Sequence, residues 1–164
     1  MTREQLEHAI RAACAVSGDT ELLVFGSQAI LGTFPEAPGD LRASIEVDVQ
    51  AKNLPDRTDF IDGALGELSQ FHATHGFYVH GVSVDSATLQ GARGNIGHCL
   101  EAHDLAVSKL VANREKDRAF VTTLLVEKLI DGNTLMARVE APPMAAERRE
   151  SIMRWVRLTL EDLV

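Results

Sequence analysis

The sequence predicts an α/β or α+β domain with a small mixed β-sheet, flanking helices and a helical C-terminal part. Three patterns carry this prediction. Segments with helical and strand-like spacing alternate in the first part of the chain, residues 44–51 alternate apolar and polar side chains, and only helical patterns follow residue 99. We expect one domain over residues 1–164, with a sheet-containing core over about 1–98 and a helical part over about 99–164.

The chain is expected to begin with a helix over residues 3–17. Thr2 and Gln5 have the spacing of a capping box, apolar residues follow at helical intervals, and Gly18 suits a helix end. The next expected elements are a buried strand over residues 21–25 and a short helix over residues 27–33 that ends in the loop TFPEAPGD.

The segment SIEVDVQA, residues 44–51, predicts a strand with an apolar face and an acidic face. Its apolar residues Ile45, Val47 and Val49 are expected to point one way, and Ser44, Glu46, Asp48 and Gln50 the other. The elements expected after it are a helix over residues 56–68, a strand over residues 76–85 and a glycine-rich loop over residues 91–97.

The rest of the chain predicts helices. Asp104 can cap a helix that closes near Asn113, and a second helix is expected from about Glu115 to Ile130. The residues DGN turn the chain, and the tail AAERRESIMRWVRLTLEDL predicts an amphipathic helix with Trp155 on its apolar side.

Composition and charge narrow the function classes. The net charge of −8 repels nucleic acid unless positive charge is concentrated in one place. The sequence contains no apolar run of the roughly 18 residues that span a membrane, and its N-terminus does not resemble a signal peptide, so we expect a cytoplasmic location. Cys14 and Cys99 have no CxxC partner and are expected to be buried thiols, and the six histidines form no clean zinc-ligand quartet.

Glu46 and Asp48 are the first candidate site residues. Alternation along a strand places both carboxylates on one face, roughly 7 Å apart. Like charges this close repel each other unless a cation lies between them, and carboxylate oxygens are ligands for Mg²⁺. Asp85, at the end of the next predicted strand, could complete a triad.

The stretch VFGSQAILG, residues 24–32, contains the second candidate. A strand runs directly into Gly26 and Ser27, and a helix is expected to follow. Backbone N–H groups at such a bend, with a serine hydroxyl beside them, can cradle a phosphate.

These pieces in this order resemble the minimal nucleotidyltransferase superfamily, with the polymerase-beta-like fold. The resemblance rests on Gly-Ser, a helical turn, a variable loop and then acid-x-acid on a strand, and it covers roughly residues 20–125. Within that superfamily, the segment HDLAVSKLVANREKD looks like the downstream helices of AbiEii-type and related nucleotidyltransferase-like proteins, several of which are toxins of toxin–antitoxin pairs.

The resemblance implies a role for each matching residue. Gly26 and Ser27 would contact the nucleotide phosphates, Glu46 and Asp48 would bind metal, and Asp85 would be the third acid. From the helical part, Lys109 and Lys116 would lie near the phosphates. The chain departs from the superfamily at position 46, where most members carry Asp, and the longer Glu46 would change the metal geometry.

Each candidate also has a structural interpretation. Gly26 and Ser27 can be a plain turn with a serine cap, and Glu46 and Asp48 can be the solvent face of an edge strand. Asp85 lies in a segment whose residues favour a turn, and Lys109 and Lys116 can extend their side chains to solvent. His72, a further pocket candidate, can serve capping and loop hydrogen bonds.

The functional expectation is a metal-dependent nucleotidyltransferase that moves an NMP from an NTP to a hydroxyl on RNA, protein or a small molecule. Mg²⁺ or Mn²⁺ would be the cofactor, and the resemblance implies a toxin–antitoxin or defence role with an antitoxin partner. A homodimer through the helix that carries Trp155 is expected under the alternative that follows. The alternative is a catalytically degenerate member of the fold that binds a nucleotide or a partner, and a third hypothesis is a metal-dependent phosphohydrolase.

Overall fold

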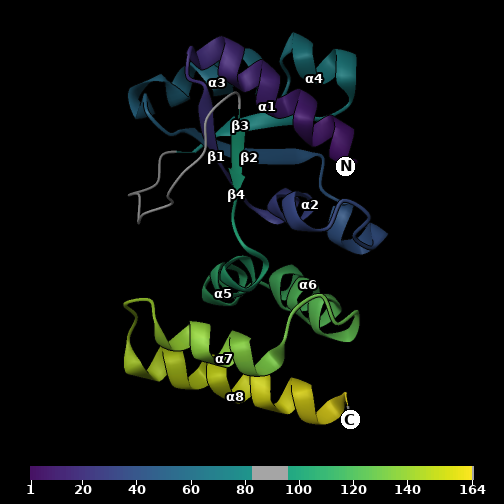
Figure 1. Ribbon diagram of the computed structural model, residues 1–164, viewed down its shortest axis with the longest axis vertical. Coiled ribbons are helices and arrows are strands. Elements are labelled where there is room, and N and C mark those ends of the chain that lie inside the picture. The colour runs from purple at the N-terminus through teal and green to yellow at the C-terminus, as the bar shows by residue number, and fades with distance from the viewer. Residues whose placement is uncertain (83–95, 164) are drawn as a thin grey trace. The chain divides into compact units, whose positions relative to one another are not determined.

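A four-stranded mixed sheet with helices around it forms the first of two units in the computed structural model, which describes residues 1–82 and 96–163. The units are Met1–Leu100 and Glu101–Val164, and the second is helical (Figure 1). The expected mixed class, with a small mixed sheet, flanking helices and a helical C-terminal part, is confirmed. In the described part of the chain, every helix is too short or too polar to cross a membrane.

The sheet has the strand order β3-β2-β1-β4. β1 pairs antiparallel with β2, β2 pairs parallel with β3, and β1 pairs parallel with β4. The strands are β1 Glu21–Phe25, β2 Glu46–Ala51, β3 Tyr78–Gly81 and β4 Ile96–Cys99. β3 and β4 are therefore the two edges, and the acidic segment lies on an inner strand.

One face of the sheet is apolar and covered by helices. Val24, Val47, Val49 and Val79 have no exposed surface and share this face. α1 (Arg3–Ser17) contacts all four strands, and α3 (Thr58–Leu65) contacts β2 and β3 (Figure 1). Burial of these branched side chains, at about 25 cal/mol per Å² of apolar surface, is the main stabilising contribution of this layer.

The capping box that begins α1 is confirmed. The Thr2 hydroxyl accepts a hydrogen bond from the Gln5 N–H at 3.2 Å, and the Gln5 side chain accepts one from the Thr2 N–H at 2.8 Å. Gly18 ends the helix in the left-handed conformation, at φ 72°. The remaining elements of this unit are η1 Ser27–Ala29, α2 Ile30–Thr33, η2 Gly39–Arg42, η3 Pro55–Arg57 and α4 Gln70–His75.

Several expected elements of the first unit differ from the structure. The helix expected over residues 27–33 is a 3-10 turn followed by a four-residue α-helix. The helix expected over residues 56–68 is divided between η3 and α3 and ends at Leu65, because Gly66 leaves the helix in an extended conformation. Leu68, expected on its apolar side, is 91% exposed.

The expectations for the strands also need correction. β2 begins at Glu46, and Ile45, which precedes it, is 49% exposed instead of buried. Of the strand expected over residues 76–85, the structure shows Tyr78–Gly81 as β3. Residues 83–85 of that expected strand lie outside the described residues. Residues 96 and 97, expected in a loop, belong to β4.

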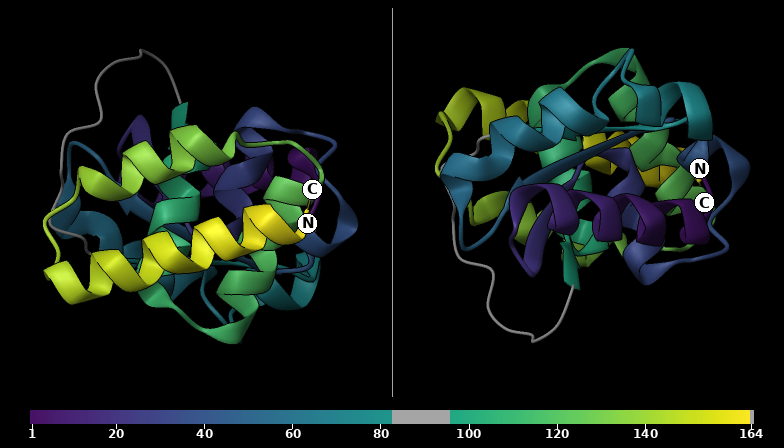
Figure 2. Two further views of the ribbon diagram at one scale, coloured as in Figure 1. Left: turned by 90° about the horizontal axis from the view of Figure 1, so that it is seen from below. Right: turned by 90° about the horizontal axis from the view of Figure 1, so that it is seen from above.

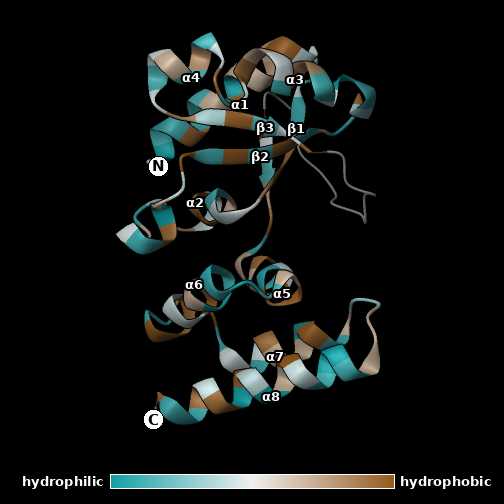
Figure 3. Cartoon of the chain, turned by 180° about the vertical axis from the view of Figure 1, so that it is seen from behind, coloured by the Kyte–Doolittle hydropathy of each residue, from teal (hydrophilic) through white to brown (hydrophobic). Residues whose placement is uncertain are grey.

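Four helices make up the described residues of the second unit. α5 Ala102–Ala112 and α6 Glu115–Val126 contact each other, α5 also contacts α7 Gly132–Glu140, and α7 lies beside α8 Ala146–Asp162 (Figure 2). Figure 3 shows hydrophobic and hydrophilic stretches alternating along α8, as expected for an amphipathic helix. Ile152 and Val156 are its buried residues.

Two boundaries and one helix in this unit differ from the sequence expectation. Glu101, not Asp104, caps α5, because its carboxylate accepts hydrogen bonds from the N–H groups of His103 and Asp104. Asn113 closes that helix in the left-handed conformation, as expected. α6 ends at Val126 instead of Ile130, and the residues DGN, expected to turn the chain, form the cap and first turn of α7, which was not expected.

Candidate metal centre

The face of the sheet opposite α1 carries a cluster of two carboxylates and one imidazole. Glu46 and Asp48 lie two residues apart on β2, so their side chains point to the same face. In the parallel β2–β3 pairing, His80 lies directly beside Asp48 and shares that face. One potential ligand atom from each of the three side chains lies within 4.8 Å of the others.

The imidazole is close to both carboxylates. His80 Nδ1 lies 3.2 Å from Glu46 Oε1 and 3.3 Å from Asp48 Oδ1. The three side chains are 47%, 37% and 29% exposed for His80, Glu46 and Asp48, so they line an accessible surface. A ligand or ion from solvent can therefore reach all three.

The bend after β1 touches this cluster. Gly26 has φ 63° and ψ −170°, a conformation that is essentially restricted to glycine. A Cβ atom at this position would overlap Asp48 Oδ2 and lie 3.2 Å from Asp48 Cγ. The acidic strand and the Gly-Ser bend thus lie together, as the sequence analysis expected, and the Asp48 carboxylate fills the space that the missing side chain leaves.

Ser27 begins η1, directly after this bend. The helix expected here would have offered several aligned N–H groups, but η1 has three residues and α2 has four. The dipole of such short helices is weak. Phosphate contact by Gly26 and Ser27 therefore remains a prediction that depends on individual N–H groups and the hydroxyl.

Further polar groups surround the cluster. Asp62 Oδ1, from α3, lies 3.9 Å from His80 Nε2. Tyr78 lies beside Glu46 in the β2–β3 pairing. Burial, together with the negative charges of Glu46, Glu67 and Asp48, raises the pKa of Tyr78, so its hydroxyl keeps its proton. The surroundings are negative, which favours a cation.

His72 does not join the cluster directly. Its ring lies 5.0 Å from the Tyr78 ring, and its Nδ1 accepts a hydrogen bond from the Leu68 N–H at 3.2 Å. The second contact is the loop hydrogen bond that the structural interpretation of His72 anticipated. Asp85, expected as the third acid, lies outside the described residues.

The two candidate lysines belong to the second unit. Lys109 is 9% exposed, its Nζ lies 3.4 Å from Asp117 Oδ1 and 5.4 Å from the Phe120 ring centroid, and it therefore contributes to the contact between α5 and α6. Lys116 is exposed on α6. A role for either lysine at nucleotide phosphates remains a prediction.

His80 was not among the residues predicted from the sequence, although it lies in the segment YVHG of the expected third strand. A histidine on the same strand face as an acid pair is a weak signal by itself. The signal becomes strong only with the β2–β3 register, which pairs residues more than thirty positions apart in the chain.

A second polar cluster lies at the other end of β1. Glu21 Oε2 is 2.5 Å from Lys52 Nζ and 2.8 Å from His98 Nε2, and all three side chains are at least four-fifths buried. Hydrogen bonds from Lys52 and His98 lower the pKa of Glu21. The Glu21 carboxylate has a cationic partner in Lys52, so this cluster resembles a structural ion-pair network.

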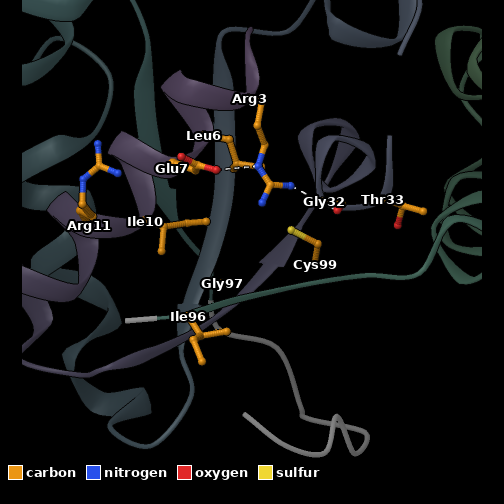
Figure 4. Close-up of a pocket in the computed structure, with 10 residues that line it drawn as sticks. All are labelled: Arg3, Leu6, Glu7, Ile10, Arg11, Gly32, Thr33, Ile96, Gly97 and Cys99. Atoms are coloured by element: carbon orange, nitrogen blue, oxygen red, sulfur yellow. Dashed lines mark hydrogen bonds and ion pairs between the residues drawn. The ribbon is translucent and has the colours of Figure 1, made fainter. Parts of the chain in front are cut away.

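A cavity of about 600 Å³ lies near the β4 edge, lined by residues of α1, α2 and β4 (Figure 4). Arg3 reaches across it and donates to the Leu31 carbonyl oxygen at 2.7 Å. Burial raises the pKa of the Cys99 thiol to about 11. None of the three clustered residues Glu46, Asp48 and His80 lines this cavity.

Comparisons with protein-family models, with curated protein sequences and with solved structures gave no match. The resemblance to nucleotidyltransferases therefore remains a hypothesis that rests on the motif residues and on the geometry described above.

Proposed function

We propose that the protein is a divalent-metal-dependent nucleotidyltransferase, which moves an NMP from an NTP to a hydroxyl acceptor. The acceptor classes are RNA, protein and small molecules. The observation that carries the proposal is the contact between Asp48 and the Gly26 bend. Two motifs separated by about twenty residues meet at one place, in the order that the superfamily resemblance requires.

The donor set fits a divalent cation. Glu46 and Asp48 offer carboxylate oxygens and His80 offers an imidazole nitrogen, with ligand atoms close enough to share one ion. Without a cation, the two carboxylates would repel each other and any phosphate. Glu46, Asp48 and His80 are therefore the residues that would hold the ion.

The position of Asp48 also explains why a metal ion would be needed. A phosphate that approaches the bend from the side on which a residue-26 side chain would lie meets the Asp48 carboxylate, because that carboxylate fills the space beside the glycine. A cation held by the Asp48 carboxylate would offset this repulsion. Ser27 could then donate its hydroxyl to a phosphate oxygen from the same bend.

The transfer step forms a bond between the acceptor oxygen and the α-phosphorus of the NTP. The bond from the α-phosphorus to the bridging oxygen breaks, pyrophosphate leaves with the electron pair, and the hydroxyl proton passes to a carboxylate of the site or to water. A bound divalent ion supplies charge stabilisation for the phosphate oxygens and makes the hydroxyl more acidic. Glu46 and Asp48 position that charge at the sheet face.

Label transfer tests the proposal. The full chain is incubated with each α-³²P-labelled NTP, Mn²⁺ or Mg²⁺, and bulk tRNA or cell lysate. We expect label on an acceptor with the wild type, at least about a hundredfold less with Asp48→Asn, and unchanged transfer with Asp40→Asn. Asp40 is an exposed acid in η2, so its amide variant controls for the loss of one surface charge.

Two outcomes would overturn the proposal and support the alternatives. Tight NTP binding without transfer would indicate a nucleotide-binding module. Release of free phosphate without label on any acceptor would indicate a phosphohydrolase that uses the same carboxylates.

A further inference from the structure

We infer that the site formed by Glu46, Asp48 and His80 selects a first-row divalent transition-metal ion, such as Mn²⁺, over Mg²⁺. The inference deepens the proposed function by naming the class of ion, and it rests on the same site. It goes beyond the sequence expectation, which treated Mg²⁺ and Mn²⁺ as equivalent and expected a third carboxylate at Asp85.

The spacing of the donor atoms fits a shared ion. Metal–ligand bonds of about 2.1–2.2 Å place neighbouring octahedral ligands about 3.0–3.1 Å apart. His80 Nδ1 lies 3.2 Å from Glu46 Oε1 and 3.3 Å from Asp48 Oδ1. The nitrogen therefore occupies a position adjacent to both oxygens in one coordination sphere, with only a small adjustment of the side chains.

The nitrogen donor determines the choice of ion. Mg²⁺ is a hard cation that takes oxygen ligands and gives up its water molecules reluctantly. Imidazole is a ligand for first-row transition ions, of which Mn²⁺ binds most weakly, so a preference for Mn²⁺ over Mg²⁺ is the most demanding form of the prediction. Among the described residues, the third donor beside the two carboxylates is the His80 nitrogen, which occupies the register position beside Asp48.

The second ring nitrogen of His80 supports this assignment. Asp62 Oδ1 is 3.9 Å from Nε2 and is a negative group on the far side of the ring. When Nδ1 binds an ion, the ring proton is carried by Nε2, on the side of this carboxylate. Asp62 comes from α3, a different element from the two carboxylate ligands, so this observation is independent of the acid pair.

Metal binding to the full chain tests the inference without any nucleotide. The protein is stripped with a chelator and titrated with Mn²⁺, while electron paramagnetic resonance measures the free ion, and Mg²⁺ is then added as competitor. We expect the wild type to bind Mn²⁺ at least about tenfold more tightly than Mg²⁺. Pulsed measurements on bound Mn²⁺ should show coupling to one imidazole ¹⁴N nucleus.

Two variants separate the nitrogen ligand from the fold. His80→Asp replaces nitrogen by oxygen, so the preference for Mn²⁺ should fall to about threefold or less and the ¹⁴N coupling should disappear. His75→Ala removes an exposed histidine of α4 and should keep both the preference and the coupling. If His80→Asp does not fold, the wild-type selectivity and coupling still decide the question.

The inference is overturned if the wild type binds Mg²⁺ as tightly as Mn²⁺, or if bound Mn²⁺ shows no ¹⁴N coupling. Coupling that persists in His80→Asp would also overturn it. Selective Mn²⁺ binding without label transfer would leave the inference standing and remove the proposed function. Label transfer that proceeds equally well with Mg²⁺ and Mn²⁺, with no ¹⁴N coupling, would overturn the inference and leave the proposed function standing.

Discussion

Gly26 serves both the backbone and the site, because the space that its missing side chain leaves is occupied by Asp48. The glycine is required by its backbone conformation and, separately, by the carboxylate that lies against it. A phosphate-binding role alone would require only the open backbone. The structure adds a second reason for glycine at this position, because the Asp48 carboxylate occupies the space of a Cβ atom.

Gly26→Ala should therefore destabilise the protein and also displace Asp48. We expect a loss of about 2–3 kcal/mol in the free energy of unfolding, because an alanine is strained in this conformation and its Cβ overlaps the carboxylate. Mn²⁺ affinity should fall in the same variant. Urea unfolding and metal titration measure the two effects.

Gly18→Ala is the matched control for that change. Gly18 has φ 72° at the end of α1, and a Cβ there would have no heavy atom within 4 Å. The Gly18→Ala variant should lose about 1 kcal/mol in the free energy of unfolding because of backbone strain, and it should keep its full Mn²⁺ affinity. Equal metal affinity in both variants would contradict the proposed contact between the bend and the site.

Cys99 is expected to be an unreactive thiol. Burial raises its pKa to about 11, although the charge of Arg3 opposes this. At pH 8 the thiolate fraction is then about a hundredfold below that of an ordinary cysteine, so alkylation by iodoacetamide should be slower by about the same factor. Peptide mapping by mass spectrometry distinguishes it from Cys14, and the rate should rise about tenfold per pH unit between pH 8 and 10. A rate that levels off near pH 9 would contradict the raised pKa.

Residue-level prediction from the sequence succeeded where the signal is local. Alternation in EVDVQ placed Glu46 and Asp48 on one face, which the structure confirms. His80 was missed because its partnership with Asp48 depends on which residues of β2 and β3 pair. A single sequence contains no signal for that register.

At the scale of elements, the connection between β1 and the segment after β2 depends on one buried carboxylate. Asp19 is 4% exposed and accepts four hydrogen bonds. Its donors are the N–H groups of Glu21, Asn53 and Leu54 and the Asn53 side chain. Burial raises the pKa of Asp19, but these hydrogen bonds outweigh burial and lower it below the usual value.

The sign of the resulting pH dependence follows from the lowered pKa. The unfolded chain binds the proton more readily, so Asp19 stabilises the fold above its unfolded pKa and loses that contribution as the pH falls through the folded pKa. Asp19→Asn should lower stability by about 2 kcal/mol at pH 7, because an amide cannot accept all four bonds, and by less near pH 3. Urea unfolding from pH 7 to 3 measures the difference, with exposed Asp40→Asn as control. An equal loss at both pH values would contradict this role.

Prediction of elements succeeded for strong patterns and failed at weak ones. α1 has a capping box and a glycine stop, and its bounds were predicted correctly. β4 was missed because the segment IGHC is short, contains glycine and follows a glycine-rich run. α7 was missed because the residues DGN look like a turn, whereas Asp131 caps the helix by accepting from the Thr134 N–H at 2.8 Å.

For the whole molecule, the net charge of −8 determines how an anionic nucleotide can bind. We expect ATP to bind at least about tenfold more weakly in EDTA than with Mn²⁺, because the negative surface and the acid pair repel the free triphosphate. In EDTA, raising NaCl from 50 to 500 mM should strengthen ATP binding, since salt screens that repulsion. Calorimetry measures both effects.

Adenosine is the control ligand for this prediction, because it lacks phosphates and should bind independently of metal and salt. Binding of ATP that is equally tight with and without Mn²⁺ would indicate a basic phosphate site elsewhere and would contradict a metal-bridged nucleotide.

The parallel pairing of β4 with β1 has a kinetic consequence. Glu21 and Ile96 are partners, so this pair closes a loop of about 75 residues, with a chain-entropy penalty of roughly 4 kcal/mol. β1 and β2 meet across a shorter segment and can assemble earlier. The strand that is recruited last should also be released first: in native-state hydrogen exchange, the amide of Ile96, which donates to the Thr20 carbonyl oxygen, should lose protection before those of β2.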